Sequence, residues 1–149
     1  MTHFFIRWPA RFLALAILGT LVVPLVVGGN AQGADEPRVG RTIDDFTLDD
    51  FRGRTRSLKE WSDAKLVVVA FLGTECPLAN LYAPRLSELA EKWKAKNVAF
   101  LGINSNQQDS ITEVGAHAQR HNFPFTILKD PGNKIADRFG AVRTPEIFI

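Results

Sequence analysis

The chain has 149 residues, of which 46% are hydrophobic and 23% are charged, and its formal net charge is +2. This composition is ordinary for one globular domain and shows no sign of disorder or of a repeat array. Nucleic-acid binding would require a basic face or stripe. The only basic cluster, Arg52, Arg54 and Arg56, alternates with Gly53 and Thr55 beside acidic residues. We interpret it as a solvated turn and expect no nucleic-acid partner.

Residues 1–31 are typical of an export signal. Two arginines form a positive segment, an apolar run covers residues 12–27, and Gly29 and Ala31 have the small-x-small spacing that a signal peptidase recognises. We predict cleavage after Ala31. The alternative is an uncleaved membrane anchor, although the apolar run is near the lower length limit for crossing a bilayer. In both cases we expect the rest of the chain to be periplasmic or secreted, with membrane contact only through an uncleaved leader.

Strand and helix patterns alternate along the rest of the chain. Continuous apolar runs at residues 65–72 and 97–103 indicate strands covered on both faces, as in the centre of an α/β sheet. Spaced apolar residues predict a long helix over residues 77–96, which Pro84 should kink. Shorter strands are expected at 46–48, 125–128 and 147–149, and shorter helices at 57–61, 110–122 and 134–139. The alternation predicts βαβ units and a mostly parallel sheet.

The expected apolar face of the long helix consists of large side chains, namely Leu78, Leu81, Leu86, Leu89 and Trp93. We divide the chain into a leader at 1–31, a linker at 32–41 and one folded domain at 42–149. An apolar last strand at a sheet edge with nothing after it would favour aggregation. We therefore expect the domain to be C-terminally incomplete, as a fragment or truncated product of a longer protein.

The only cysteine, Cys76, follows the expected central strand and directly precedes the long helix. The first N–H groups of a helix have no backbone partners and carry the positive end of the helix dipole, so they stabilise a thiolate. The carboxyl end of a central strand is also where open α/β sheets place their sites. A chain with one cysteine cannot form an internal disulfide, so Cys76 is either buried and inert or a free reactive thiol.

Three segments together resemble the redoxin branch of the thioredoxin superfamily, the alkyl hydroperoxide reductase/thiol-specific antioxidant (AhpC/TSA) family. Residues 39–48 resemble the redoxin N-terminus, residues 66–89 its strand–cysteine–helix unit, and residues 140–149 the stretch around its cis-proline, here Pro145. The resemblance runs from Val39 to the end. It implies a three-layer α/β/α thioredoxin-like fold with a central mixed sheet and a single-cysteine variant of the family's site.

The resemblance also implies a thiol oxidoreductase in which Cys76 attacks a disulfide or a peroxide. Thr74 could hydrogen-bond the sulfur, and Arg143 could stabilise a developing negative charge. The backbone around Thr144 and a cis Pro145 would dock the substrate. Expected partners are a protein thiol or disulfide or a peroxide, together with an external thiol or reductant that resolves the product. No cofactor and no metal are expected.

Several positions depart from the family's pattern. Ala79 stands where a second cysteine is usual, and Gly73 stands where peroxiredoxins have Thr or Ser. The peroxiredoxin arginine should align near Pro145 rather than at Arg143. Glu75 replaces a common aromatic residue, and its charge opposes a low thiol pKa, which favours disulfide exchange over fast peroxide reduction. A non-catalytic binding or scaffold module of a larger exported protein is the alternative.

His117 and His121 are four residues apart on an expected helix, a spacing that metal ligands can have. No acidic third ligand accompanies them in that segment. We therefore interpret the pair as part of a solvated helix face. The loop at residues 104–106 matches no phosphate-binding motif.

Overall fold

The structure, a computed structural model, describes residues 40–149. The predicted signal peptide, its cleavage site and nearly all of the predicted linker lie outside the described residues. Within residues 40–149, no helix combines the length and the apolar character needed to cross a bilayer.

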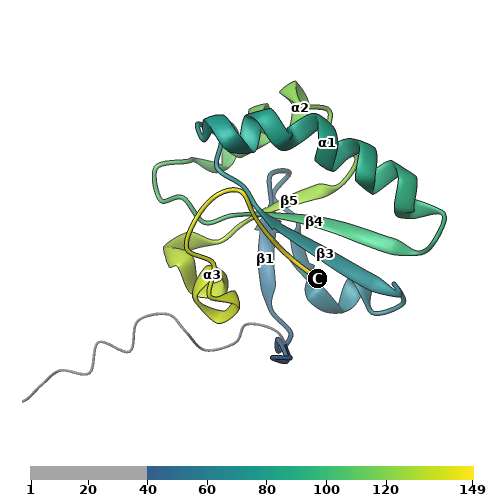
Figure 1. The fold of residues 1–149 in the computed structure, drawn as a ribbon. Helices are drawn as coiled ribbons and strands as arrows, with labels where there is room; N and C mark the ends of the chain where they lie inside the picture. The colour runs from purple at the N-terminus through teal and green to yellow at the C-terminus, as the bar shows by residue number, and fades with distance from the viewer. Residues whose placement is uncertain (1–39) are drawn as a thin grey trace, which may run out of the picture. The chain divides into compact units, whose positions relative to one another are not determined.

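A six-stranded mixed sheet lies at the centre of the domain (Figure 1). Its strands are β1 (Thr47–Asp50), β2 (Thr55–Ser57), β3 (Leu66–Phe71), β4 (Val98–Asn104), β5 (Thr126–Lys129) and β6 (Glu146–Phe148). They lie in the order β2-β1-β5-β4-β3-β6. β3, β4 and β5 are parallel, whereas β1 is antiparallel to β2 and β5, and β6 is antiparallel to β3. β3 and β4 pair in parallel, as expected for a βαβ unit, but three of the five strand pairs within the described residues are antiparallel, so the sheet is mixed rather than mostly parallel.

Helices cover both faces of the sheet, which gives the three layers expected from the resemblance. α1 (Pro77–Lys94) and α2 (Ile111–Arg120) lie on one face, and α3 (Lys134–Phe139) lies on the other (Figure 1). Two 3-10 turns, η1 (Leu58–Trp61) and η2 (Pro131–Asn133), complete the elements of the described residues. α2 begins at a capping box in which Ser110 and Glu113 bond to each other's backbone N–H groups, a local signal that sets its start.

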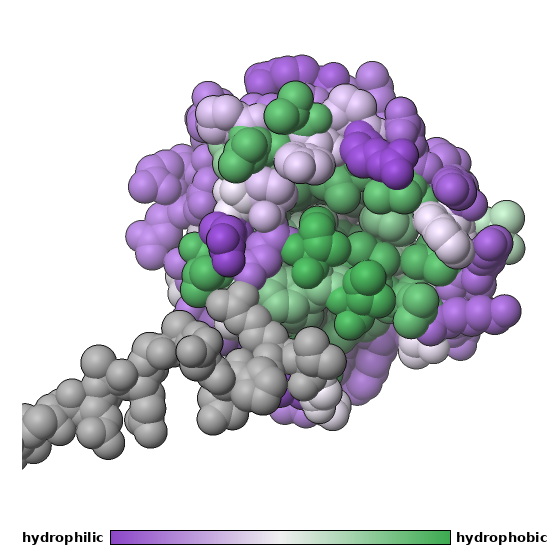
Figure 2. Space-filling view, in the orientation of Figure 1, coloured by the Kyte–Doolittle hydropathy of each residue, from purple (hydrophilic) through white to green (hydrophobic). Residues whose placement is uncertain are grey.

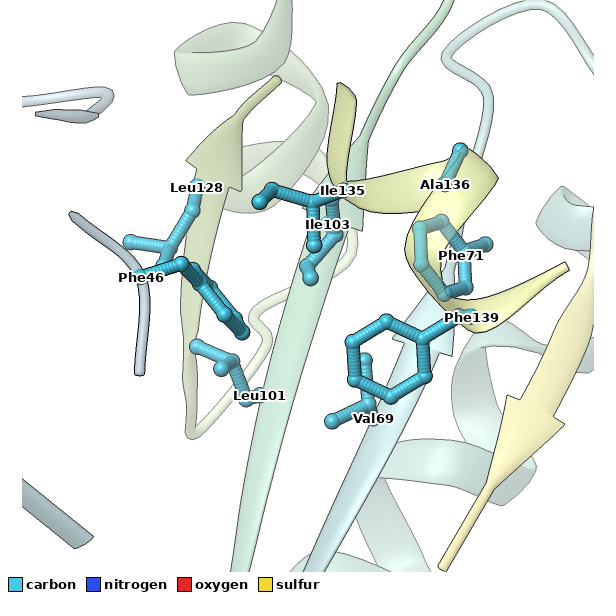
Figure 3. Close-up of a cluster of buried hydrophobic side chains, with 9 residues drawn as sticks. All are labelled: Phe46, Val69, Phe71, Leu101, Ile103, Leu128, Ile135, Ala136 and Phe139. Carbon is cyan, nitrogen blue, oxygen red and sulfur yellow. The ribbon is translucent and has the colours of Figure 1, made fainter. Parts of the chain in front are cut away.

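Two apolar cores join the layers, and β3 contributes to both because its side chains alternate between faces. Val69 and Phe71 belong to the core under α3, where Phe71 and Phe139 meet edge to face with ring centroids 5.5 Å apart (Figure 3). Ala70 and Leu72 belong to the core under α1 and α2. The uninterrupted apolar run in the sequence is therefore explained by a strand covered on both sides.

The buried face of α1 differs from the face that we expected. Its buried residues are small except for one leucine: Ala79, Ala83, Leu86 and Ala90. Leu78 and Leu81, expected in the core, are 56% and 71% exposed. The alanines allow the helix to approach the sheet closely, so the large residues of the first turns are left on the surface. The helix runs through Pro84 as one element, and the predicted kink at that residue stays a prediction.

An apolar groove of about 600 Å³ lies on the α3 side of the sheet. Its apolar lining includes residues from four elements, among them Trp61, Val67, Phe139 and Phe148. Figure 2 shows apolar side chains gathered around a hollow on the side of the domain seen in Figure 1. Cys76 is not among the residues that line this groove, so the groove and the thiol are separate features.

Candidate thiol site

Cys76 is the N-cap residue of α1, and Pro77 occupies the first turn, as the sequence predicted. The thiol is partly exposed and forms no disulfide. Pro77 suits this position because a first-turn N–H would lack a backbone partner in any case. The chain therefore presents its one thiol at the positive end of an 18-residue helix.

The segment before β6 contacts the sulfur directly. The Thr144–Pro145 peptide bond is cis, which confirms the prediction. The contact with Cys76 is made by Thr144, whose carbonyl oxygen accepts a hydrogen bond from the Cys76 Sγ at 3.1 Å. Residues separated by 68 positions in the sequence thus meet at the thiol. A close approach of Pro145 itself to Cys76 stays a prediction.

The pKa of the Cys76 thiol is lowered from its ordinary value. The largest cause is a hydrogen bond from the Thr144 side chain, and the N–H groups of Ala79 and Leu78 add to it, whereas burial acts in the opposite direction. The Thr144 carbonyl favours the protonated thiol, because a thiolate has no hydrogen to donate to it. Since the pKa is lowered overall, the donors outweigh both opposing effects.

Glu75 does not act as we expected. Its side chain is exposed, and it is not among the groups of residues 40–149 that shift the pKa of Cys76. Glu75 and Cys76 are adjacent in the sequence, but adjacency alone does not bring the Glu75 carboxylate to the sulfur. In the structure the N–H groups that follow the cysteine and the hydroxyl of Thr144 determine the shift instead.

Gly73 lies where three other side chains converge. A Cβ atom built on Gly73 would lie 2.6 Å from Asn106 Nδ2, 3.2 Å from Thr144 Oγ1 and 3.3 Å from Cys76 Cβ. The φ of Gly73 is outside the left-handed region, so its backbone conformation does not require glycine. Glycine is favoured here instead because the Asn106 amide occupies the space that a side chain at position 73 would need. Asn106 follows β4 in the polar loop for which the sequence indicated no role.

Asp109 joins this loop to the turn before the cysteine. It is 5% exposed, and its Oδ2 accepts hydrogen bonds from the Thr74 N–H at 2.9 Å, Asn104 Nδ2 at 2.6 Å and Asn106 Nδ2 at 3.3 Å. Burial raises the pKa of Asp109. These three donors and the Thr74 side chain outweigh that effect, so the pKa is lowered overall. Thr74 is therefore held by Asp109. We had expected Thr74 to hydrogen-bond the sulfur, but within residues 40–149 no such bond is present.

The two histidines are not a solvated helix face, so that interpretation was wrong. His117 is 2% exposed, and its Nε2 lies 2.8 Å from Asn80 Oδ1 of α1. Asn80 Nδ2 in turn donates to the Thr74 carbonyl at 3.2 Å. His121 is half-buried, with its ring centroid 4.7 Å from that of His117. His117 thus supports the cysteine-bearing turn from beneath α1.

Arg143 is exposed in the segment before the cis bond. Its backbone N–H donates to Glu146 Oε2 at 3.3 Å, and the N–H of Val142 donates to the same oxygen at 2.8 Å. These bonds shape the turn that leads into Thr144. Leu78, Tyr82 and Val142 are also exposed large apolar residues of the segments that flank the thiol.

This arrangement, a mixed sheet between helical layers with a half-exposed cysteine at a helix start beside a cis-proline, defines a thioredoxin-like thiol protein. Residues 39–149 match the AhpC/TSA family. The chain therefore belongs to the AhpC/TSA family.

Relatives include both thiol-disulfide oxidoreductases and peroxiredoxins. The chain is 24% identical over 139 residues to thiol-disulfide oxidoreductase ResA of Bacillus cereus, covering 93% of this chain and 79% of that protein. It is 32% identical over 101 residues to the chloroplastic peroxiredoxin Q of Sedum lineare, covering 68% of this chain and 53% of that protein. The chain thus spans about half the length of the second relative.

Solved structures show the same fold. A hypothetical protein of Sinorhizobium meliloti superposes with a TM-score of 0.67 at 29% identity, covering 72% of this chain and 65% of that chain. A secreted disulfide oxidoreductase of Mycobacterium tuberculosis superposes with a TM-score of 0.61 at 24% identity, covering 68% and 72%. The second likeness supports the fold alone.

We expect Thr144→Val to raise the pKa of Cys76 and to slow its alkylation by iodoacetamide at neutral pH about tenfold. A hydrogen bond to a charged group contributes about 1.5 kcal/mol, which is about one pKa unit. The measurement is the alkylation rate as a function of pH. Thr144→Ser, which keeps the hydroxyl, and Glu75→Gln should both follow the unchanged protein. A valine variant with the original profile would contradict the role of Thr144.

Proposed function

We propose that this protein is an extracytoplasmic thiol oxidoreductase that acts through Cys76, chiefly by disulfide exchange. The observation that carries the proposal is the setting of the thiol. Cys76 is partly exposed at the start of α1, and the Thr144 side chain and the helix N–H groups lower its pKa. These are the conditions that make a cysteine reactive rather than structural.

The proposed reaction begins with attack of the Cys76 thiolate on one sulfur of a substrate disulfide. A bond forms between Sγ and that sulfur while the substrate S–S bond breaks, and the second substrate sulfur leaves as a thiolate and takes a proton from water. Cys76 is then held in a mixed disulfide. A partner thiol, after losing its proton to water, attacks the substrate sulfur of this mixed disulfide, so that a new S–S bond forms between partner and substrate and Cys76 leaves as a thiolate. A partner is needed for this step because Ala79 stands at the usual position of the second cysteine.

Disulfide exchange fits the surroundings of the sulfur better than fast peroxide reduction. Position 73, where peroxiredoxins have Thr or Ser, is a glycine whose side-chain space contains the Asn106 amide. The Thr74 N–H and side chain bond Asp109. We propose that Thr144 and Pro145 dock the substrate and that exposed Arg143 offers positive charge at the rim. A role for Thr74 would then be to hold the cysteine-bearing turn.

The proposed location rests on the leader. Residues 1–31 have the charge and apolar pattern of an export signal. An oxidising compartment would supply disulfide substrates for a protein of this kind.

A second candidate function is a non-catalytic binding or scaffold module. The observation that favours it is Ala79, which is 0% exposed in the core under α1. The usual position of a resolving cysteine is thus built into apolar packing. A module of this kind would keep the fold and the docking segment without turning over a substrate.

The test is mixed-disulfide formation by the full chain, with Cys76→Ser as the control. We expect oxidised glutathione to form a covalent adduct with the unchanged protein, detected by mass spectrometry, and an added dithiol to release it. The serine variant should form no adduct. A folded protein whose Cys76 remains free under these conditions would favour the scaffold module and reject the proposed activity.

A further inference from the structure

The Asn106 amide is held in place from two sides. Its Nδ2 donates to Asp109 Oδ2 at 3.3 Å, and its backbone carbonyl accepts a hydrogen bond from Lys129 Nζ. Lys129 Nζ also donates to Asn104 Oδ1 at 2.8 Å, which fixes the loop to the ends of β4 and β5. Asn106 is therefore a rigidly supported group although it lies in a loop.

The amide also has a hydrogen to spare. A primary amide has two N–H donors, and Asp109 accepts from Nδ2. Within residues 40–149 no second acceptor for Nδ2 is present. Asn106 is half-buried, and its Nδ2 borders the same point as Thr144 Oγ1 and Cys76 Cβ. Within the described residues, the second Nδ2–H of this supported amide therefore has no acceptor, and it borders the space that Gly73 leaves open next to Cys76.

We propose that Asn106 is a catalytic residue of this site and that Asp109 is the positioning residue that orients it. The free Nδ2–H donates to the substrate sulfur on which negative charge develops as the substrate S–S bond breaks. This inference rests on the proposed disulfide exchange. A fixed donor aimed at developing charge accelerates a reaction because it needs no reorganisation in the transition state.

Gly73 contributes to the same arrangement because it leaves room for the Asn106 amide. A larger residue there would push the Asn106 amide away, because its Cβ would come within 2.6 Å of Nδ2. The donor beside the sulfur therefore comes from the loop after β4 and not from the residue three positions before the cysteine. In this proposal the Asn106 amide replaces the hydroxyl donor that peroxiredoxins have at the position of Gly73.

The test measures the rate of attack by the thiolate on two disulfides. In oxidised glutathione the leaving thiol is basic and carries concentrated charge, whereas in 5,5′-dithiobis(2-nitrobenzoate) it is acidic and delocalises its charge. We expect Asn106→Ala to slow the reaction with oxidised glutathione about tenfold. The reaction with the nitrobenzoate disulfide should change much less. The pKa of Cys76, followed by thiolate absorbance, should stay close to its original value.

Further variants separate a donor from a structural support. Asn106→Leu fills the same space without a donor and should reproduce the selective loss. The double variant Asn106→Ala with Gly73→Ser should recover part of the rate lost with oxidised glutathione. The serine hydroxyl would enter the space that the Asn106 amide leaves empty. Gln108→Ala removes an exposed amide of the same loop and should change neither rate.

Two outcomes overturn the inference and are distinguishable. An equal loss with both disulfides, or no loss in the Asn106 variants, would remove Asn106 from the reaction while leaving the activity of Cys76 intact. An unchanged protein that reacts with neither reagent would instead reject the proposed function, and the inference with it.

Discussion

Replacement of Asp109 by alanine is expected to lower the free energy of unfolding by about 3 kcal/mol. The substitution removes this acceptor from the N–H and side chain of Thr74 and from the Asn104 amide, and both of these residues are buried. A buried polar group without a partner costs about 1–3 kcal/mol. The Asn106 amide also loses this acceptor. Such a loss is large against a typical domain stability of about 5–15 kcal/mol.

Urea unfolding at neutral pH measures this effect. Asp109→Asn keeps one oxygen acceptor and should lose less than the alanine variant, whereas Asp63→Ala changes an exposed aspartate and should have little effect. If the Asp109→Ala variant unfolds at the same urea concentration as the unchanged protein, the network does not stabilise the fold. The Asp109 variants, but not Asp63→Ala, should also slow disulfide exchange, because Asp109 holds both Asn106 and the turn before Cys76.

The contribution of Asp109 also has a definite pH window. Its pKa in the folded protein is below the ordinary value of about 3.8. The unfolded chain therefore takes up this proton at a higher pH than the folded protein does, and the stabilisation is complete above that ordinary pKa. It is lost as the pH falls further, through the folded pKa. Alanine at position 109 should remove this part of the acid dependence.

The elements that the sequence predicted best are those determined by local patterns. The apolar run of β3 indicated a central strand because burial on both faces removes the alternation between polar and apolar residues. Pro77 and the flanking cysteine marked the start of α1, and Ser110 with Glu113 marked the start of α2. In each case the signal lies within a few residues of the feature that it predicts.

The features that the sequence did not predict depend on distant partners. The burial of His117 depends on Asn80, 37 residues away, and the role of Asp109 depends on Thr74, 35 residues away. The buried face of α1 was misassigned because small alanines, not the larger leucines, pack against the sheet. No local pattern distinguishes an Asn in a polar loop from one that approaches a thiol, so Asn106 emerged only from the structure.

The thiol is flanked by exposed apolar residues and is carried on a hydrogen-bonded turn. Leu78 and Tyr82 extend apolar surface along the exposed side of α1, next to Cys76. The turn that carries the cysteine is held at Thr74, whose N–H donates to Asp109 and whose carbonyl accepts a hydrogen bond from Asn80. The turn that carries the cysteine is therefore anchored both to α1 and to the loop before α2.

The second large effect that we expect is a loss of stability between about pH 6.5 and pH 4, caused by His117. The pKa of His117 is lowered to about 4, chiefly by burial and also by the nearby charges of His121 and Arg120, while Asp109 acts in the opposite direction. The unfolded chain keeps an ordinary histidine pKa of about 6.5, so it binds the proton first as the pH falls.

The stabilisation from neutral His117 is therefore complete above about pH 6.5 and declines until the folded protein itself takes up the proton near pH 4. A difference of this size corresponds to about 3 kcal/mol. Denaturant unfolding across this pH range should show the decline, and His117→Gln, which keeps an amide toward Asn80, should flatten it. Titration of the His117 ring by NMR gives an independent check. A ring that titrates near 6.5, or a glutamine variant with the same decline, would show that the buried histidine is not the cause.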